Sequence, residues 1–269
     1  MAGVKGAAHI GVIKALEEND IEIEALAGTS IGSIVVALYA MGYTTKQMLG
    51  IFKYSAKGIM KAEPHHFADN IKNSRKLLGL GLISGENTEI AVEECAKEKN
   101  IKNMNEIKMP ISIPAVDIVN SKKYVFTNGN LNGECFIKNA PISKAVRASS
   151  SYPVVFSPCE YLGHKFIDGG VLDNVPADEV KRLGADKIIS VKFCANLNYE
   201  PKSIYELATK SVDILFDGRS EEAIKISDFV LDLNMLNARV FDTKKIDYCY
   251  KIGYEETIKH IDEIKEILK

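Results

Sequence analysis

The chain has 269 residues, 46% of them hydrophobic and 26% charged, which is the composition of an ordinary globular protein. Because 34 Lys and Arg residues nearly balance 36 Asp and Glu residues, the formal net charge of −2 excludes the basic signature of a dedicated nucleic-acid binder. The five cysteines are odd in number and far apart, as expected of reduced thiols in a cytoplasmic protein and not of a disulfide or zinc framework.

The first part of the chain combines a strand with helices. In order, we expect a glycine-rich turn at 3–6, a helix that ends near residue 17, a strand over 23–27 and a helix over 34–41. The last of these is apolar on all sides, as a helix buried within a fold would be, and Gly42 is suited to end it. With eight residues, 34–41 is the longest apolar run, whereas a membrane span needs about 20.

Residues 53–85 differ in character from the rest of the chain. They follow Thr44 and Gln47, which fit a capping box that opens a helix. Six basic residues in 53–76 oppose two acidic ones, and helical periodicity is lost. Long excursions in compact domains are often lids, so we expect 53–85 to form a mobile cap. Its apolar side chains suit an anionic lipid surface, with a solvated basic face as the alternative. These side chains are Tyr54, Ile59 and Met60, together with Phe52 directly before the segment.

The remainder again alternates helices with strands. We expect helices over 86–98, 141–148, 176–183, from 203 onward and at the C-terminal end, and strands over 111–115, 123–127, 165–167, 187–193 and 229–233. The strand over 187–193 is the best candidate for a buried strand. The helix that opens with Ser203 and Glu206 carries one apolar face, formed by Ile204, Leu207, Ala208, Ser211 and Leu215. This alternation indicates one α/β domain, 1–269, with a largely parallel sheet.

The segment Gly28-Thr29-Ser30-Ile31-Gly32 is a G-x-S-x-G motif between an expected strand and an expected helix. In that setting the motif forms a sharp turn that exposes the serine hydroxyl, while the helix N-terminus favours developing negative charge. A small-residue turn without chemistry is the alternative. The motif indicates Ser30 as a candidate nucleophile.

A nucleophilic serine needs a base, which is usually a histidine. Only His260 follows Asp168 in the order serine, aspartate, histidine, and it is expected on the polar side of the last helix. This order is that of the α/β-hydrolase fold, which places several strands before its nucleophilic serine. A serine at position 30 comes too early for that fold, so a histidine triad is disfavoured. The other carboxylate signal is Asp168-Gly169-Gly170, in which an aspartate at a strand end can project into a cleft. A plain Asp-Gly turn is the alternative.

Together these residues resemble the patatin-like phospholipase family. The Gly3-Val4-Lys5-Gly6 turn, the elbow at 28–32, the stretch 147–158 and the Asp168-Gly169-Gly170 motif occur in the family's order. The resemblance is close over 3–42 and 145–194 and looser elsewhere. It implies an α/β fold with three layers, α/β/α, around a central, mostly parallel sheet.

The resemblance also implies a Ser–Asp dyad without histidine, in which Ser30 is the nucleophile and Asp168 accepts its proton. The remaining implied site residues are Gly3, Val4, Lys5 and Gly6 for the oxyanion hole, Gly28, Thr29, Ile31 and Gly32 for the elbow, and Gly169 and Gly170 beside the base. This predicts a serine acyl-ester hydrolase that acts through an acyl-enzyme on phospholipid, lysophospholipid or a related lipid ester. No cofactor and no metal are expected.

The chain departs from the family's pattern at its start. The family's turn reads G-G-G-x-[KR]-G after a first strand, whereas residues 1–6 read Met-Ala-Gly-Val-Lys-Gly without a strand. We therefore expect that the sequence begins inside its fold, through truncation or a misassigned start. The alternative function is a catalytically weakened lipid-binding or regulatory relative. The expected partner is a lipid ester met transiently from the aqueous side, by a protein that is cytoplasmic or peripheral to a membrane; the oligomeric state is not predicted.

Overall fold

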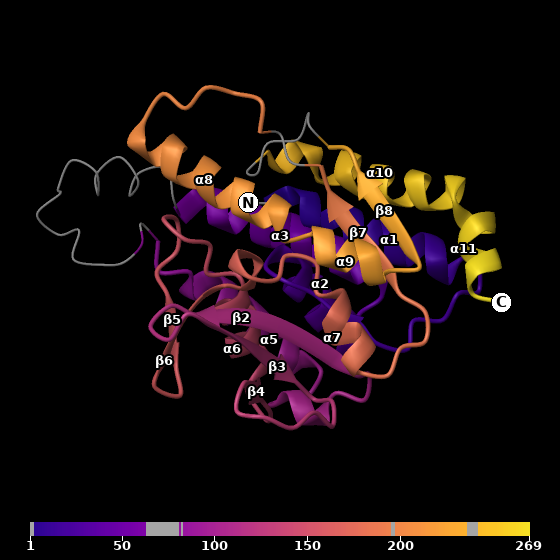
Figure 1. Cartoon of the computed structure of the whole chain (residues 1–269), viewed down its shortest axis with the longest axis horizontal. Coiled ribbons are helices and arrows are strands. Elements are labelled where there is room, and N and C mark those ends of the chain that lie inside the picture. Colours follow the sequence, from indigo (N-terminus) through magenta and orange to yellow (C-terminus); the bar gives the residue numbers. More distant parts are fainter. Residues whose placement is uncertain (1–2, 63–80, 82, 195–196, 236–241) are drawn as a thin grey trace, which may run out of the picture.

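The computed structural model describes residues 3–62, 81, 83–194, 197–235 and 242–269, and it has an α/β fold (Figure 1). Helices cover both faces of a central sheet; in Figure 1, α7 lies in front of this sheet and α5 and α6 lie behind it. The described helices are α1 (Ala7–Glu17), α2 (Ile31–Ala40), α3 (Thr45–Ala62), α5 (Glu86–Glu98), α6 (Ile142–Ser149), α7 (Ala177–Arg182), α8 (Ile204–Gly218), α9 (Glu221–Ile226), α10 (Ile246–Lys259) and α11 (Ile261–Ile267). Short 3-10 helices are η1 (Gly3–Gly6), η3 (Met104–Glu106), η4 (Gly169–Val171) and η5 (Thr243–Lys245).

The central sheet is mixed. Its strands are β1 (Leu26–Ala27), β2 (Ile111–Asp117), β3 (Lys122–Thr127), β4 (Phe136–Ile137), β5 (Cys159–Tyr161) and β6 (His164–Asp168). The β1–β2 and β3–β4 pairs are parallel, whereas β2–β3 and β5–β6 are antiparallel because short turns connect them. A second, parallel sheet consists of β7 (Ile189–Phe193) and β8 (Phe229–Leu233).

The strand β2 is buried along its whole length and organises the sheet. One of its edges pairs with β3, and its other edge is shared by two strands. Ala27 of β1 lies opposite Ser112, and Asp168 of β6 lies opposite Ala115 on the same edge. Because β1 runs parallel to β2 and β6 runs antiparallel to it, the carboxyl ends of β1 and β6 point toward each other.

Most expected elements occur where the sequence places them, and the capping box is confirmed in detail. Thr44 N–H donates to Gln47 Oε1 over 3.0 Å, and Gln47 N–H donates to Thr44 Oγ1 over 3.3 Å. Gly42 follows α2 with φ of +81°, a left-handed conformation that suits glycine. The strand expected over 23–27 is shorter, because β1 contains only Leu26 and Ala27.

Two expectations are wrong in part. The excursion expected over 53–85 begins later, because α3 continues as a regular helix to Ala62; the stretch 63–80 lies outside the described residues. Phe52 is buried and so does not face a lipid surface, whereas Tyr54 is 82% exposed; the side chains of Ile59 and Met60 lie outside the described ones. The strand β7 is not fully buried, since only Ser190 among its residues is.

Helices from the two ends of the chain pack directly on each other. A Cβ atom on Gly11 of α1 would collide with the carbonyl oxygen of Tyr250, and one on Gly253 of α10 would collide with that of Ala8. Glycine at both positions therefore lets the two backbones touch. Across the described ranges, no helix combines the length and hydropathy needed to cross a membrane.

Candidate active site

Ser30 occupies a sharp turn between β1 and α2. Its backbone has φ of 56° and ψ of −122°, outside the regions that L-residues prefer. The turn is tight, since a Cβ atom on Gly28 would lie 2.6 Å from the carbonyl oxygen of Gly32. Such a conformation costs on the order of 1–3 kcal/mol and persists only where surrounding contacts hold it.

Two serine hydroxyls hold this strained backbone. Ser30 N–H donates to Ser149 Oγ over 3.0 Å, and Ser33 Oγ donates to the carbonyl oxygen of Ser30 over 2.5 Å. Ser149 lies at the end of α6 and is fully buried. Sequence reasoning noticed the stretch 147–158 as part of a family pattern but assigned no role to Ser149.

Asp168 ends β6 and lies directly beside Ser30. The Ser30 hydroxyl donates to Asp168 Oδ2 over 2.5 Å, and Gly170 N–H donates to Asp168 Oδ1 over 2.9 Å. The carboxyl group is fully buried, and its loss of hydration raises its pKa to about 7, although both hydrogen bonds oppose this rise. The structure thus brings the two predicted residues together, 138 positions apart in the chain.

The two glycines after Asp168 are required by close packing. A Cβ atom on Gly169 would collide with the carbonyl oxygen of Pro114 in β2, and one on Gly170 would lie 2.5 Å from the ring of Phe216 in α8. Phe216 belongs to an apolar cluster with Tyr152 and Val155, and this cluster lies beside the carboxyl group. The Asp-Gly-Gly motif is therefore packed between the central sheet and α8.

The Gly3–Gly6 segment forms η1 and leads directly into α1. Gly6 packs against Ile31, the residue after Ser30, so this segment lies next to the elbow. Val4 is buried, and Lys5 is half-buried with a pKa lowered by its burial. The expected oxyanion residues and the elbow are thus adjacent.

Among the described histidines, none hydrogen-bonds to Ser30 or Asp168. His9 stacks on Phe193 with ring centroids 4.6 Å apart, and burial lowers its pKa to about 4, so it is neutral near pH 7. His164 pairs with Asp117, and His260 pairs with Glu263 at 3.2 Å. His65 and His66 lie outside the described residues.

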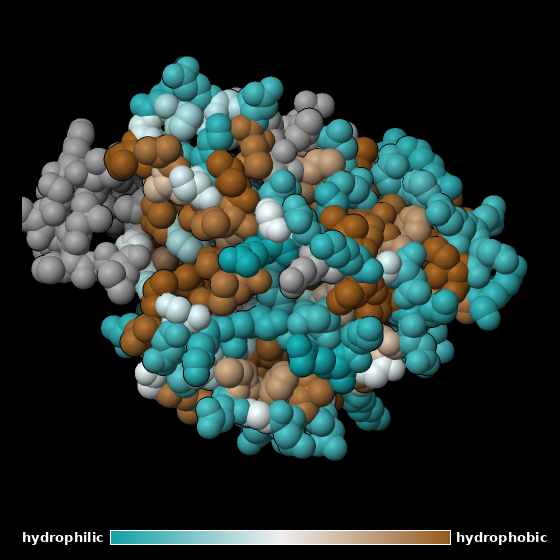
Figure 2. Space-filling model, viewed as in Figure 1, coloured by the Kyte–Doolittle hydropathy of each residue, from teal (hydrophilic) through white to brown (hydrophobic). Residues whose placement is uncertain are grey.

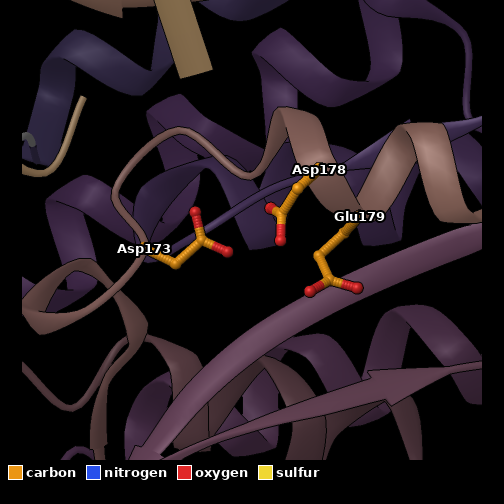
Figure 3. A group of neighbouring side chains, drawn as sticks. All are labelled: Asp173, Asp178 and Glu179. Atoms are coloured by element: carbon orange, nitrogen blue, oxygen red, sulfur yellow. The ribbon is translucent and has the colours of Figure 1, made fainter. Parts of the chain in front are cut away.

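A largely buried acidic cluster lies next to Thr29, and Figure 3 shows its three side chains. Thr29 Oγ1 donates to the carbonyl oxygen of Asp173, and the carboxylate of Asp173 lies near those of Asp178 and Glu179. Lys123 Nζ is 2.9, 3.0 and 2.8 Å from one oxygen of Asp173, Asp178 and Glu179 respectively. The ammonium group occupies the place where a bound cation would neutralise these carboxylates, and we regard the cluster as structural. Sequence reasoning did not identify Lys123, which it placed within a strand.

A cavity of about 600 Å³ lies between β1 and β7 and is lined by both strands together with α1 and α7. Within the described residues, β1 pairs only with β2 and β7 pairs only with β8, so each strand presents an unpaired edge to this cavity. Neither Ser30 nor Asp168 lines it. Gly28, Thr29 and Gly32 do line it, so the cavity borders the turn that carries Ser30.

Comparisons with known proteins point to one family. A family model described as patatin-like phospholipase matches residues 2–181. An uncharacterized NTE family protein of Mycobacterium tuberculosis is 29% identical over 189 residues, which cover 70% of this chain and 46% of that protein. Lysophospholipase NTE1 of Meyerozyma guilliermondii is 28% identical over 190 residues, which cover 70% of this chain and 12% of that protein. The chain thus spans less than half the length of these two relatives.

Two solved structures share the fold. VipD from Legionella pneumophila superimposes with a TM-score of 0.53 at 14% identity, covering 97% of this chain and 65% of VipD. The type III effector protein ExoU superimposes with a TM-score of 0.52 at 14% identity, covering 98% of this chain and 52% of ExoU. With the family model matching about two thirds of the sequence, the chain belongs to the patatin-like phospholipase family of lipid hydrolases.

Proposed function

We propose that this chain hydrolyses carboxylic esters of lipids, with Ser30 as nucleophile and Asp168 as general base. The observation that carries the proposal is the 2.5 Å hydrogen bond between Ser30 Oγ and a buried carboxyl group whose pKa is raised to about 7. A base works best when its pKa lies near the working pH, because it must both accept and return a proton. The buried apolar cluster of Phe216, Tyr152 and Val155 packs against Gly170, beside this pair.

The reaction proceeds in two halves. Ser30 Oγ attacks the ester carbonyl carbon while Asp168 Oδ2 takes the hydroxyl proton, and the tetrahedral intermediate then expels the alcohol, which receives that proton. The acyl group remains on Ser30. A water molecule next gives a proton to Asp168 and attacks the acyl carbon, and collapse of this second intermediate releases the fatty acid and returns the proton to Ser30 Oγ.

Negative charge that develops on the carbonyl oxygen needs hydrogen-bond donors. We assign this role to the backbone N–H groups of Gly3, Val4, Lys5 and Gly6, supported by the contact between Gly6 and Ile31. This segment also lies at the N-terminus of α1, where unpaired N–H groups and the helix dipole favour an anion. Loss of one such donor typically reduces the rate by ~100- to 1000-fold.

The dependence of turnover on pH follows from Asp168. The carboxyl group must be ionised to accept the proton of Ser30, so kcat/KM is expected to rise about tenfold per pH unit below pH 7 and to level off above it. Hydrolysis of a dissolved short-chain ester, measured between about pH 5 and 9, gives this profile directly. A profile that is flat from pH 5 to 7 would contradict the assignment of Asp168 as the base.

A fluorophosphonate probe tests the nucleophile. We expect stoichiometric labelling of the full-length protein at Ser30 and none in Ser30→Ala. The matched control is Ser150→Ala, because Ser150 Oγ donates only to the Val146 carbonyl among described residues and should leave labelling unchanged. An unlabelled wild-type protein, or equal labelling of Ser30→Ala, would overturn the proposal.

A further inference from the structure

Helix α8 presents an apolar stripe to solvent. Ile204 is 82% exposed, and Leu207, Ile214 and Leu215 are 50%, 49% and 50% exposed. Positions 204, 207, 211, 214 and 215 follow helical spacing and therefore share one side of the helix. Figure 2 shows hydrophobic residues gathered along α8 in the view of Figure 1. We call Ile204, Leu207, Ile214 and Leu215 the α8 stripe.

The opposite side of α8 packs on the proposed active site. The ring of Phe216 lies against Gly170, and Tyr152 Oη lies 2.8 Å from Asp213 Oδ1 and 2.9 Å from the carbonyl oxygen of Thr209. A helix with its side chains is about 10 Å thick. Whatever covers the α8 stripe therefore lies about one helix diameter from the Asp-Gly-Gly motif.

We propose that the α8 stripe inserts into the surface of an electrically neutral, zwitterionic lipid layer and so places the dyad above the lipid it hydrolyses. This inference rests on the proposed function, because only a lipid substrate gives a reason for the two sites to be adjacent. An amphipathic helix that buries an apolar face at the boundary between headgroups and acyl chains is a common way to hold a protein on a membrane surface.

The size of the stripe favours lipid over a second protein. Fully burying an aliphatic side chain removes roughly 60–120 Å² from water, so four half-exposed or more exposed side chains offer on the order of 200 Å². A stable protein interface buries about 800 Å² on each partner. A lipid surface needs no matching contour, so a narrow stripe is enough for it.

The charges around the stripe favour a neutral surface over an anionic one. Within 202–219, Lys202, Lys210 and Arg219 oppose Glu206 and Asp217, since Asp213 contacts Tyr152 on the other side of the helix, and the charge around the stripe is only about +1. Lys210 Nζ lies over the ring of Tyr199, 4.8 Å from its centroid, near the first turn of α8. Tyrosine and lysine combine apolar bodies with polar ends, which suits them to the boundary of a lipid layer.

The absence of tryptophan from the sequence permits a direct test. We would place a single tryptophan in the stripe, Ile204→Trp, and another on a distant exposed helix position, Ile90→Trp, both in full-length Ser30→Ala protein. With phosphatidylcholine vesicles, we expect the emission of Ile204→Trp to shift to shorter wavelength at low and at high salt, and that of Ile90→Trp to stay unchanged. No shift, an equal shift in both variants, a shift with anionic vesicles alone, or a concentration-dependent shift without vesicles would each overturn the proposal.

An activity test separates this inference from the proposed function. Leu207→Gln combined with Leu215→Gln should reduce hydrolysis of vesicle phospholipid on the order of tenfold, because two apolar anchors are lost. Hydrolysis of a dissolved short-chain ester should stay within twofold of wild type. Equal activity on vesicles overturns the docking role. If the wild-type protein hydrolyses neither substrate, the proposed function fails, while the fluorescence experiment still decides whether α8 docks.

Discussion

Two buried aspartates five residues apart, Asp168 and Asp173, have opposite surroundings. Within the described part of the chain, the carboxyl group of Asp168 accepts hydrogen bonds from two neutral donors, the Ser30 hydroxyl and the Gly170 N–H. The carboxyl group of Asp173 accepts a hydrogen bond from the ammonium group of Lys123 over 2.9 Å. Burial raises the pKa of both groups, but at Asp173 the positive charge of Lys123 opposes that rise.

The difference in surroundings suits the two carboxyl groups to different roles. A general base must take up a proton during the reaction, and a lysine beside it would hold the carboxylate ionised and weaken it as a base. A structural carboxylate has the opposite need, because an unpaired buried charge destabilises the fold. In the proposed function, an aspartate thus serves chemistry where its hydrogen-bond donors are neutral, and an aspartate five residues later serves architecture where its donor is a cation.

Replacing Asp168 by asparagine should have the largest effect. Asp168→Asn is expected to reduce turnover about 10⁴-fold, since the amide cannot accept the proton of Ser30. It should also remove a pH-dependent loss of stability. A carboxyl group whose pKa is about 7 in the folded state and 3.8 when exposed stabilises the fold fully below about pH 4 and loses this contribution as pH rises through 7. At pH 8 the variant should therefore be more stable than wild type, by up to about 4 kcal/mol.

Urea unfolding at pH 4.5 and pH 8 measures this stability change. Ser30→Ala is the matched control, because it is equally inactive but keeps the ionisable group and hence the loss of stability with rising pH. If Asp168→Asn and wild type show the same dependence of stability on pH, the Asp168 carboxyl group does not titrate near pH 7 as its burial among neutral donors predicts.

Removing the cation from the acidic cluster should have the next largest effect. Lys123→Met leaves the buried carboxylate of Asp173 without its counter-ion and leaves Glu179 only the longer pair with Arg182 at 3.7 Å, so we expect a loss of roughly 3–5 kcal/mol in the free energy of unfolding. The control is Lys165→Met, which breaks an exposed pair with Glu160 and should cost less than about 1 kcal/mol. Equal losses in the two variants would show that Lys123 has no special structural role.

Replacing Ser149 should have the smallest effect. It tests whether the hydrogen bond between Ser149 and the Ser30 backbone holds the proposed nucleophile in place. Ser149→Ala removes the acceptor for Ser30 N–H, which costs about 1 kcal/mol and should lower kcat on the order of tenfold with little change in KM. Ser150→Ala is the matched neighbour and should behave as wild type. A rise in KM at constant kcat would instead indicate that Ser149 acts on substrate binding.

The sequence predicts the two members of the dyad because each lies in a local motif with its own turn chemistry. Ser30 is marked by flanking glycines between a strand and a helix, and Asp168 by a strand end followed by two glycines. The contact between Ser30 and Asp168 depends on how distant strands pair, which local sequence patterns do not contain. It arises because β1 and β6 share one edge of β2 while running in opposite directions.

The role of Lys123 and the exposed side of α8 have no signal in the local sequence. Lys123 lies in a strand, where a lysine is usually solvated, and its three partners are at least 50 residues away in the chain. Helix α8 is apolar on two sides, since Tyr205, Val212 and Phe216 join a packed cluster while Leu207 and Leu215 face solvent. Spacing therefore predicts the helix but not which side is buried. The sequence predicts a change of character at residue 53, where lysines become frequent, whereas α3 continues to Ala62.

The contact between α1 and α10 has a consequence for biosynthesis. The glycines that join them are separated by more than 240 residues, so α1 emerges from the ribosome long before its partner exists. At about 5–20 residues per second, the interval is on the order of 10–50 s. During that time the apolar side of α1, which carries the Gly3–Gly6 turn at its start, has no α10 to cover it. The Gly3–Gly6 turn, which contacts α10, can therefore reach its final packing only after α10 has been synthesised.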